Sequence, residues 1–104
     1  MAAQHVRTSV EDVIAVVTID RPPVNALNSQ VLDELHAAIT DLEQDNQVRV
    51  IIITGGGQRA FVAGADINEI LQSTAPEAAL VFAKKGHGLF DMIEALGKPV
   101  IAAI

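Results

Sequence analysis

The stretch from Gly55 to Ile70, GGGQRAFVAGADINEI, is where this sequence could do chemistry. Its centre, AFVAGAD at residues 60–66, is small and apolar and carries no reactive side chain before Asp66. Such a segment can act only through its backbone, because unpaired N–H groups beside a helix N-terminus can bind an anion or a developing oxyanion. Gly64 would let a ligand approach closely. The alternative is a tight turn that only leads into a helix, and the residue types alone favour that turn.

The glycines before this segment offer a second chemistry, the binding of a nucleotide. Gly55, Gly57 and Ala60 match a relaxed G-x-G-x-x-A dinucleotide pattern. That pattern requires a helix to begin at the glycines, so that its N-terminus meets the pyrophosphate. Here an irregular stretch follows instead, which argues against nucleotide binding. A minimal nucleotide-binding βαβ domain stays as an alternative, and titration with NAD and with acetyl-CoA would separate the two.

Other reactive side chains are scattered. The histidines lack the spacing of metal ligands, and the serines lie outside any G-x-S-x-G elbow, so we expect neither a metal site nor a serine nucleophile. These residues are His5, His36, His87, Ser9, Ser29 and Ser73. We expect the charged pairs on the helices to lie on solvated faces. They are Asp33/Glu34, Asp41/Glu43 and Lys84/Lys85.

Composition limits the class of protein. A chain of 104 residues forms at most one small domain, and with 50% hydrophobic but 3% aromatic residues its core must be aliphatic. The net charge of −6 with seven basic residues excludes the basic face that nucleic acid requires. The absence of cysteine fits a reducing compartment. No secretory signal and no apolar run of the roughly 18 residues that a membrane helix needs is visible, so we expect a soluble, cytoplasmic protein.

The elements that would position the loop follow from periodicity. We expect strands at 4–10, 13–19, 48–53 and 99–104, and helices at 29–44, 66–72 and 76–96. The first two strands should form a hairpin, and the apolar run at 48–53 should be buried on both faces. The order β-β-α-β-α-α-β indicates α/β layers with right-handed crossovers.

Helix faces and caps can also be predicted. Asn28 or Ser29 should cap the first long helix, and Asp66 with Glu69 has the spacing of a capping box. The apolar stripe of the first long helix is Val31, Leu32, Leu35, Ala38, Ile39 and Leu42. That of the last helix is Phe82, Leu89, Phe90, Ile93 and Leu96.

Three stretches together resemble the crotonase superfamily, the enoyl-CoA hydratases and isomerases. They are VVTIDRPPVNALN (16–28), VRVIIITGGGQRAFVAGADINEI (48–70) and GKPVIAAI (97–104), in the family's order and spacing. The resemblance implies the N-terminal portion of a crotonase-like ββα spiral over residues 1–104. Because the sequence stops inside an apolar strand, we expect it to be truncated after Ile104.

The resemblance also implies a site. By motif position, the backbone N–H of Ala65 is one half of an oxyanion hole for a thioester carbonyl. The backbone at 63–67 (Ala63, Gly64, Asp66, Ile67) would follow coenzyme A, and the 24–27 turn (Val24, Ala26, Leu27) would form another wall of its channel. Asp66 is interpreted as a helix cap. Some relatives carry near Asn68 a lysine that approaches the CoA phosphate, and this sequence does not.

The implied reaction is hydration of a 2-enoyl-CoA, adding water across the C2–C3 double bond. Coenzyme A is part of the substrate, and no permanently bound cofactor is expected. The second oxyanion donor and the acid/base glutamates are expected beyond Ile104, so the 104-residue chain alone should be inactive. Full-length relatives form homo-oligomers, trimers or dimers of trimers.

Several alternatives stay open on the same scaffold. They are double-bond isomerisation, dehalogenation, thioester hydrolysis, the N-terminal part of a multifunctional fatty-acid oxidation protein, and a non-catalytic CoA-binding module.

Overall fold

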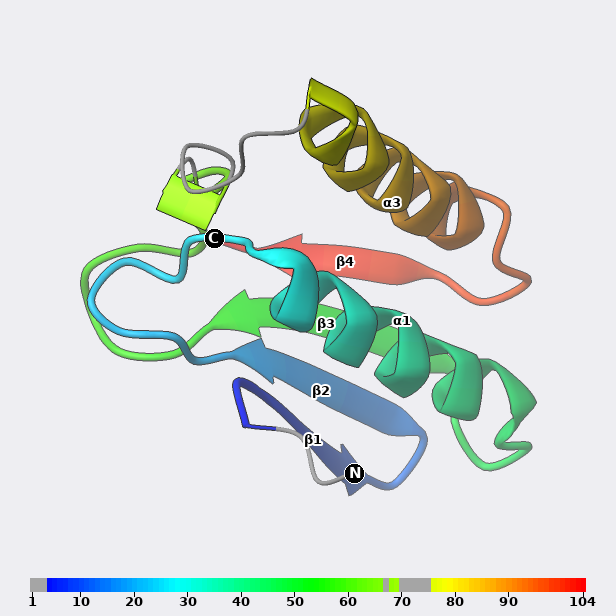
Figure 1. Ribbon diagram of the computed structural model, residues 1–104. Helices are drawn as coiled ribbons and strands as arrows, with labels where there is room; N and C mark the ends of the chain where they lie inside the picture. Colours follow the sequence, from blue (N-terminus) through cyan, green and yellow to red (C-terminus); the bar gives the residue numbers. More distant parts are fainter. Residues whose placement is uncertain (1–3, 67, 70–75) are drawn as a thin grey trace.

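A computed structural model describes residues 4–66, 68–69 and 76–104, which form a four-stranded sheet and two long helices (Figure 1). In chain order the elements are β1 (Val6–Glu11), β2 (Ile14–Ile19), α1 (Ser29–Gln44), β3 (Val50–Gly55), α3 (Pro76–Glu94) and β4 (Val100–Ala103). These six predicted elements are confirmed to within a few residues. Of the helix predicted at 66–72, Asn68 and Glu69 are helical, and Ile67 and residues 70–72 lie outside the described residues.

The sheet has the order β1-β2-β3-β4. β1 and β2 form the predicted hairpin, with Val6 opposite Ile19. β2, β3 and β4 run parallel, so the segments that contain α1 and α3 cross over between them. The carboxyl ends of these parallel strands therefore meet at one edge of the sheet. Loop 20–28 and loop 56–66 leave the sheet at this edge and run beside each other (Figure 1).

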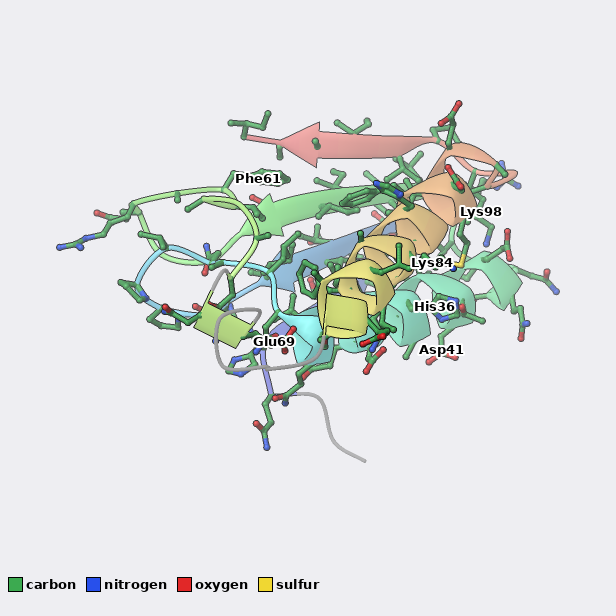
Figure 2. All side chains as sticks on the ribbon, turned by 45° about the horizontal axis from the view of Figure 1, so that its top comes forward. His36, Asp41, Phe61, Glu69, Lys84 and Lys98 are labelled. Atoms are coloured by element: carbon green, nitrogen blue, oxygen red, sulfur yellow. The ribbon has the colours of Figure 1, made fainter. Side chains whose placement is uncertain are left out.

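Both long helices cover the same face of the sheet. In β2, alternate residues point into the core: Ala15, Val17 and Ile19 are all buried. The predicted stripe of α1 faces them, with five of its six residues buried and Ala38 packed against the core. α3 lies alongside α1 and contributes Leu89 to the same core (Figures 1 and 2).

The prediction that β3 is buried on both faces was wrong. Only Ile51 is buried in this strand, and Ile52 on the opposite face is partly exposed. On the same face, Ile101 opposite Ile52 is 52% exposed, and Ile14 opposite Val50 is 40% exposed. The reason is that, in the part of the chain that the structure describes, both long helices lie on the opposite face of the sheet (Figure 1).

The predicted apolar stripe of α3 needs one correction. Leu89 is buried, and Phe82, Ile93 and Leu96 pack against the core, but Phe90 is 52% exposed. Successive residues on a helix are about 100° apart. With Leu89 buried in the core, the next residue is turned towards solvent.

Both ends of α1 are capped. Asn28, and not Ser29, is the N-cap: its side-chain oxygen accepts from the Val31 N–H at 2.9 Å. At the other end Lys98 Nζ donates to the carbonyls of Leu42 (2.6 Å) and Asp45 (2.7 Å). A cation at a helix C-terminus satisfies orphan carbonyls and opposes the negative end of the helix dipole.

Within the residues described, no helix has both the length and the apolar character needed to cross a membrane.

Candidate functional site

Loop 20–28 and loop 56–66 are joined by three backbone hydrogen bonds. The Ala63 N–H donates to the Val24 carbonyl at 3.0 Å, and the Leu27 N–H donates to the Gly64 carbonyl at 2.8 Å. The Asp66 N–H then donates back to the Leu27 carbonyl at 2.7 Å. The structure therefore brings together the two segments that, by the resemblance to the crotonase superfamily, were expected to share a site.

The last two of these bonds determine where the Ala65 N–H points. They form a parallel bridge between Leu27 and Ala65, in which Leu27 supplies both the donor and the acceptor. Leu27 bonds to the residues on either side of Ala65, Gly64 and Asp66. In a parallel pair, the residue between two such bonds directs its own N–H and C=O away from the partner segment. Ala65 is exposed, and its N–H has no acceptor among the described residues. Within the described residues, a backbone donor without an acceptor thus lies at the predicted position.

Gly64 gives this donor an open approach. Its φ is +130°, a conformation that residues with a Cβ rarely adopt, and nothing lies within 4 Å of where its Cβ would be. Ala63 is also exposed. Val24, Ala26 and Leu27 are partly exposed across from them, while Ile67 lies outside the described residues.

Asp66 is held by an ion pair and caps the following helix. Its Oδ2 lies 2.8 Å from Arg21 Nη2, and its Oδ1 accepts from the Asn68 N–H at 3.0 Å. The hydrogen bond from Arg21 holds the pKa of this carboxyl below its usual range, assisted by the Asn68 and Glu69 amides and opposed by burial. Arg21 Nη1 also donates to the Ala26 carbonyl at 3.0 Å. The bond from the Asn68 N–H agrees with the interpretation of Asp66 as a helix cap, and that Asp66 is not an acid catalyst stays a prediction.

The second half of the predicted capping box was wrong. A capping-box Glu69 would accept from the Asp66 N–H, but that N–H is used by Leu27. Glu69 instead accepts from the Ser29 N–H at 3.1 Å and from the Ser29 hydroxyl at 2.8 Å. It therefore ties the region after Ala65 to the first turn of α1 (Figure 2).

The glycines shape a loop that folds back on itself. A Cβ on Gly55 would lie 2.6 Å from the Ala60 carbonyl oxygen, and one on Gly56 would lie 2.7 Å from Asp20 Cγ. Residues 56–66 contain no helix, so no helix N-terminus meets the glycines. The dinucleotide pattern requires such a helix, so this geometry argues against nucleotide binding. A cavity of about 330 Å³ lies beside the loop, lined by Thr54, Gly55, residues 57–61, Ala103 and Ile104. Residues 63–66 do not line it.

Sequence reasoning missed Asn25, which joins the two loops from inside. It is 2% exposed and adopts φ +59°. Its Nδ2 lies within hydrogen-bond distance of the carbonyls of Gly56 (3.0 Å), Ala60 (3.0 Å) and Phe61 (3.2 Å). The available signal was an asparagine after two prolines, since asparagine tolerates the left-handed region better than most residues.

Among the residues that the structure places, no group of three histidine, aspartate or glutamate side chains could hold a metal ion.

Comparison with known proteins identifies the family. The enoyl-CoA hydratase/isomerase family matches residues 9–104. A short-chain-enoyl-CoA hydratase of Clostridium acetobutylicum is 43% identical over 105 residues, covering 100% of this chain and 40% of the relative. The fatty acid oxidation complex subunit alpha of Idiomarina loihiensis is 38% identical over 96 residues, covering 90% of this chain and 14% of the relative.

Solved structures agree with this assignment. An enoyl-CoA hydratase/carnithine racemase from Magnetospirillum magneticum superposes with a TM-score of 0.90 at 33% identity, over 99% of this chain and 39% of that one. An enoyl-CoA hydratase from Bacillus anthracis gives a TM-score of 0.89 at 29% identity, over 95% and 39%. The chain thus spans about 40% of the length of the hydratases it matches. It belongs to the enoyl-CoA hydratase/isomerase family and forms an N-terminal portion of the crotonase fold.

Proposed function

We propose that this chain is the N-terminal part of an enoyl-CoA hydratase that acts on 2-enoyl-CoA thioesters. In this proposal the Ala65 N–H donates to the thioester oxygen and stabilises the negative charge that develops there when water adds to C3. The observation that carries the proposal is the Leu27–Ala65 bridge, which leaves the Ala65 N–H exposed and directed away from its paired segment. The names of the relatives favour hydration over the other reactions of the family.

A backbone donor suits this role because it is already fixed in place when charge develops. One such donor contributes about 10²–10³ in kcat in enzymes that stabilise an oxyanion. Here the donor is held by hydrogen bonds on both sides of it, at Gly64 and Asp66. Coenzyme A, as part of the substrate, would follow residues 63–67 on one side and residues 24–27 on the other.

The proposal assigns proton transfer to groups outside this chain. The two carboxylates nearest in sequence to Ala65 are occupied, Asp66 by Arg21 and Glu69 by Ser29. General acid–base groups contribute about 10²–10⁴ in rate. We therefore expect the purified 104-residue chain to bind crotonyl-CoA without hydrating it above background. Robust turnover by the chain alone would contradict this assignment.

The test of Ala65 uses a chimera in which residues 1–104 replace the matching part of the Clostridium acetobutylicum hydratase. An ester in place of the Gly64–Ala65 amide removes the Ala65 N–H and keeps the methyl group. We expect kcat to fall by about 10²–10³ with unchanged affinity for CoA. Ala65→Gly, which keeps the N–H, should be mild.

The matched control is an ester in place of the Ala63–Gly64 amide. It also weakens one backbone carbonyl in this loop, but it leaves the Ala65 N–H in place, so kcat should change little. If the Ala65 ester variant folds, binds CoA normally and turns over at the parent rate, Ala65 is not an oxyanion donor. The segment 60–66 would then be a turn that only leads into a helix.

The assembly of the whole protein is part of the same proposal. We expect a homo-oligomer, trimeric or hexameric, which sedimentation of the chimera would measure.

A further inference from the structure

We propose that Asn25 is a positioning residue that holds segment 63–66, and with it the Ala65 N–H, in the direction that an oxyanion donor requires. This inference rests on the proposed function for its catalytic meaning. Its structural content is that one buried side chain fixes the relation between loop 20–28 and loop 56–66.

The Asn25 side chain is attached firmly to its own loop. Its Oδ1 accepts from the Arg21 N–H at 2.8 Å, and its backbone N–H donates to the Arg21 carbonyl, also at 2.8 Å. These two bonds close residues 21–25 into a compact turn. The carboxamide is therefore held from behind and presents its amino group to loop 56–66.

That amino group holds the start of loop 56–66 and the middle of the same loop together. Its two N–H bonds are shared among three carbonyls, those of Gly56, Ala60 and Phe61. Figure 2 shows Phe61 at the end of β3, where the loop returns. Because Asn25 is 2% exposed, water has little access to replace these bonds if the side chain is lost.

The connection from Asn25 to Ala65 is short. Val24, directly before Asn25, accepts from Ala63, and Leu27, two residues after it, brackets Ala65. A shift of Asn25 relative to loop 56–66 would therefore move both partners of segment 63–66. Since a displacement of about 1 Å can cost about a hundredfold in rate, a residue that touches no substrate can still control the site.

Few residues other than asparagine satisfy both demands of this position. Glycine would adopt φ +59° readily but lacks the amide. Aspartate has the same shape and tolerates the left-handed region, but its carboxylate would face three carbonyl oxygens with no proton to donate. These two substitutions therefore separate the backbone requirement from the hydrogen bonds.

The test measures hydrogen exchange by NMR on the 104-residue chain, without ligand. In Asn25→Gly, the amides of Leu27, Ala63 and Asp66 should exchange at least about tenfold faster, because local opening becomes easier. Amides that pair β2 with β3 should keep their protection. Asn46→Gly is the matched control, an exposed turn asparagine that should change nothing in the site.

Two exchange results would overturn the inference. Unchanged protection at residues 27, 63 and 66 would show that Asn25 does not hold the segment. An equal loss across the whole sheet would show that it serves general stability instead.

Asn25→Asp keeps the inference falsifiable if Asn25→Gly does not fold. At neutral pH, protection at residues 27, 63 and 66 should be lost. At acidic pH the protonated acid can donate one hydrogen bond, so protection factors should partly recover. Wild-type protection in Asn25→Asp at neutral pH would overturn the inference.

A second measurement concerns the oxyanion. With crotonyl-CoA labelled with ¹³C at the thioester carbonyl, the wild-type chain should lower the carbonyl stretching frequency of the bound ligand. Asn25→Gly should reduce that shift while the Kd for CoA changes by less than about threefold. If the wild-type chain binds without any shift, the proposed function of Ala65 fails, and the exchange experiment still decides the role of Asn25. A full shift in Asn25→Gly would refute the positioning role.

Discussion

Gly55→Ala tests how tightly the glycine loop must close. A Cβ at this position would lie 2.6 Å from the Ala60 carbonyl oxygen and 2.7 Å from Phe61 Cα. Both neighbours are backbone atoms, so no side-chain rotation can make room. The Phe61 carbonyl oxygen lies closer still. A carbon atom at ordinary contact stands about 3.5 Å from its neighbour, so the loop would have to open by roughly 1 Å or more.

The magnitude follows from what that opening breaks. The carbonyls of Ala60 and Phe61 accept from Asn25 at 3.0 and 3.2 Å, and a shift of about 1 Å would lengthen both bonds beyond hydrogen-bond range. Overpacking costs about 1–3 kcal/mol, and each lost hydrogen bond about 1 kcal/mol. We expect Gly55→Ala to lower the free energy of unfolding by about 3–5 kcal/mol, and Tm by about 4 °C for each kcal/mol.

The assay is urea unfolding of the 104-residue chain, followed by circular dichroism. Gly88→Ala is the matched control: Gly88 lies inside α3, and nothing stands within 4 Å of its missing Cβ. That change should stabilise the chain by about 0.5–1 kcal/mol, because alanine favours the helix. A double variant with Asn25→Gly should be less destabilised than the sum of the two single changes, since both act on the same two carbonyls.

Two results would refute this reasoning. A Gly55→Ala variant within about 0.5 kcal/mol of the wild type would mean that the loop is not closed as the structure shows. Strict additivity with Asn25→Gly would mean that the two residues do not share the Ala60 and Phe61 carbonyls.

Two further predictions concern stability away from the loop. Glu34 Oε1 accepts from the backbone N–H groups of residues 4–6 at 2.8–3.0 Å. Burial raises the pKa of this carboxyl, but these hydrogen bonds and a neighbouring side-chain amide outweigh the effect of burial, so the pKa is lowered. The stabilisation by the Glu34 carboxylate is therefore present above the unfolded pKa of about 4.3 and is lost as the pH falls through the folded value. Glu34→Gln should lower the free energy of unfolding by about 1–2 kcal/mol at neutral pH, after allowance for exposure, and by nearly nothing in strong acid. Urea unfolding at a series of pH values measures this difference, and a difference that does not vary with pH would contradict it. Lys98→Met removes the donor to the Leu42 and Asp45 carbonyls. It should lower the free energy of unfolding by about 1–3 kcal/mol in the same assay at neutral pH. A change below about 0.3 kcal/mol would show that water replaces the ammonium group.

Local sequence determined the elements of this protein. The stripe from Val31 to Leu42 repeats with the period of a helix, and an asparagine stands directly before it, so α1 and its candidate caps could be read from neighbouring residues alone. The same holds for the β1–β2 hairpin. Spacing inside a helix also placed on the buried side one residue, Phe90, that the structure leaves 52% exposed.

For the site, the sequence marked segments but not contacts. The stretches around 24–27 and 60–66 were singled out, and the resemblance to the crotonase superfamily placed Ala65 among them. The hydrogen bonds that give these segments their geometry join residues far apart in the chain. Asn25 reaches carbonyls 31, 35 and 36 residues away, and Glu69 reaches back 40 residues to Ser29.

Tertiary structure decided these pairings because the parallel register of β2 and β3 brings both loops to one edge of the sheet. A capping box predicts that Glu69 binds the Asp66 N–H, but the fold offers that N–H to Leu27 and places Ser29 within reach of the carboxylate. Burial of β3 likewise depends on what covers each face of the sheet, which an apolar run does not encode. Periodicity records neighbours within one turn or one strand, whereas the direction of the Ala65 N–H depends on which distant backbone lies beside it.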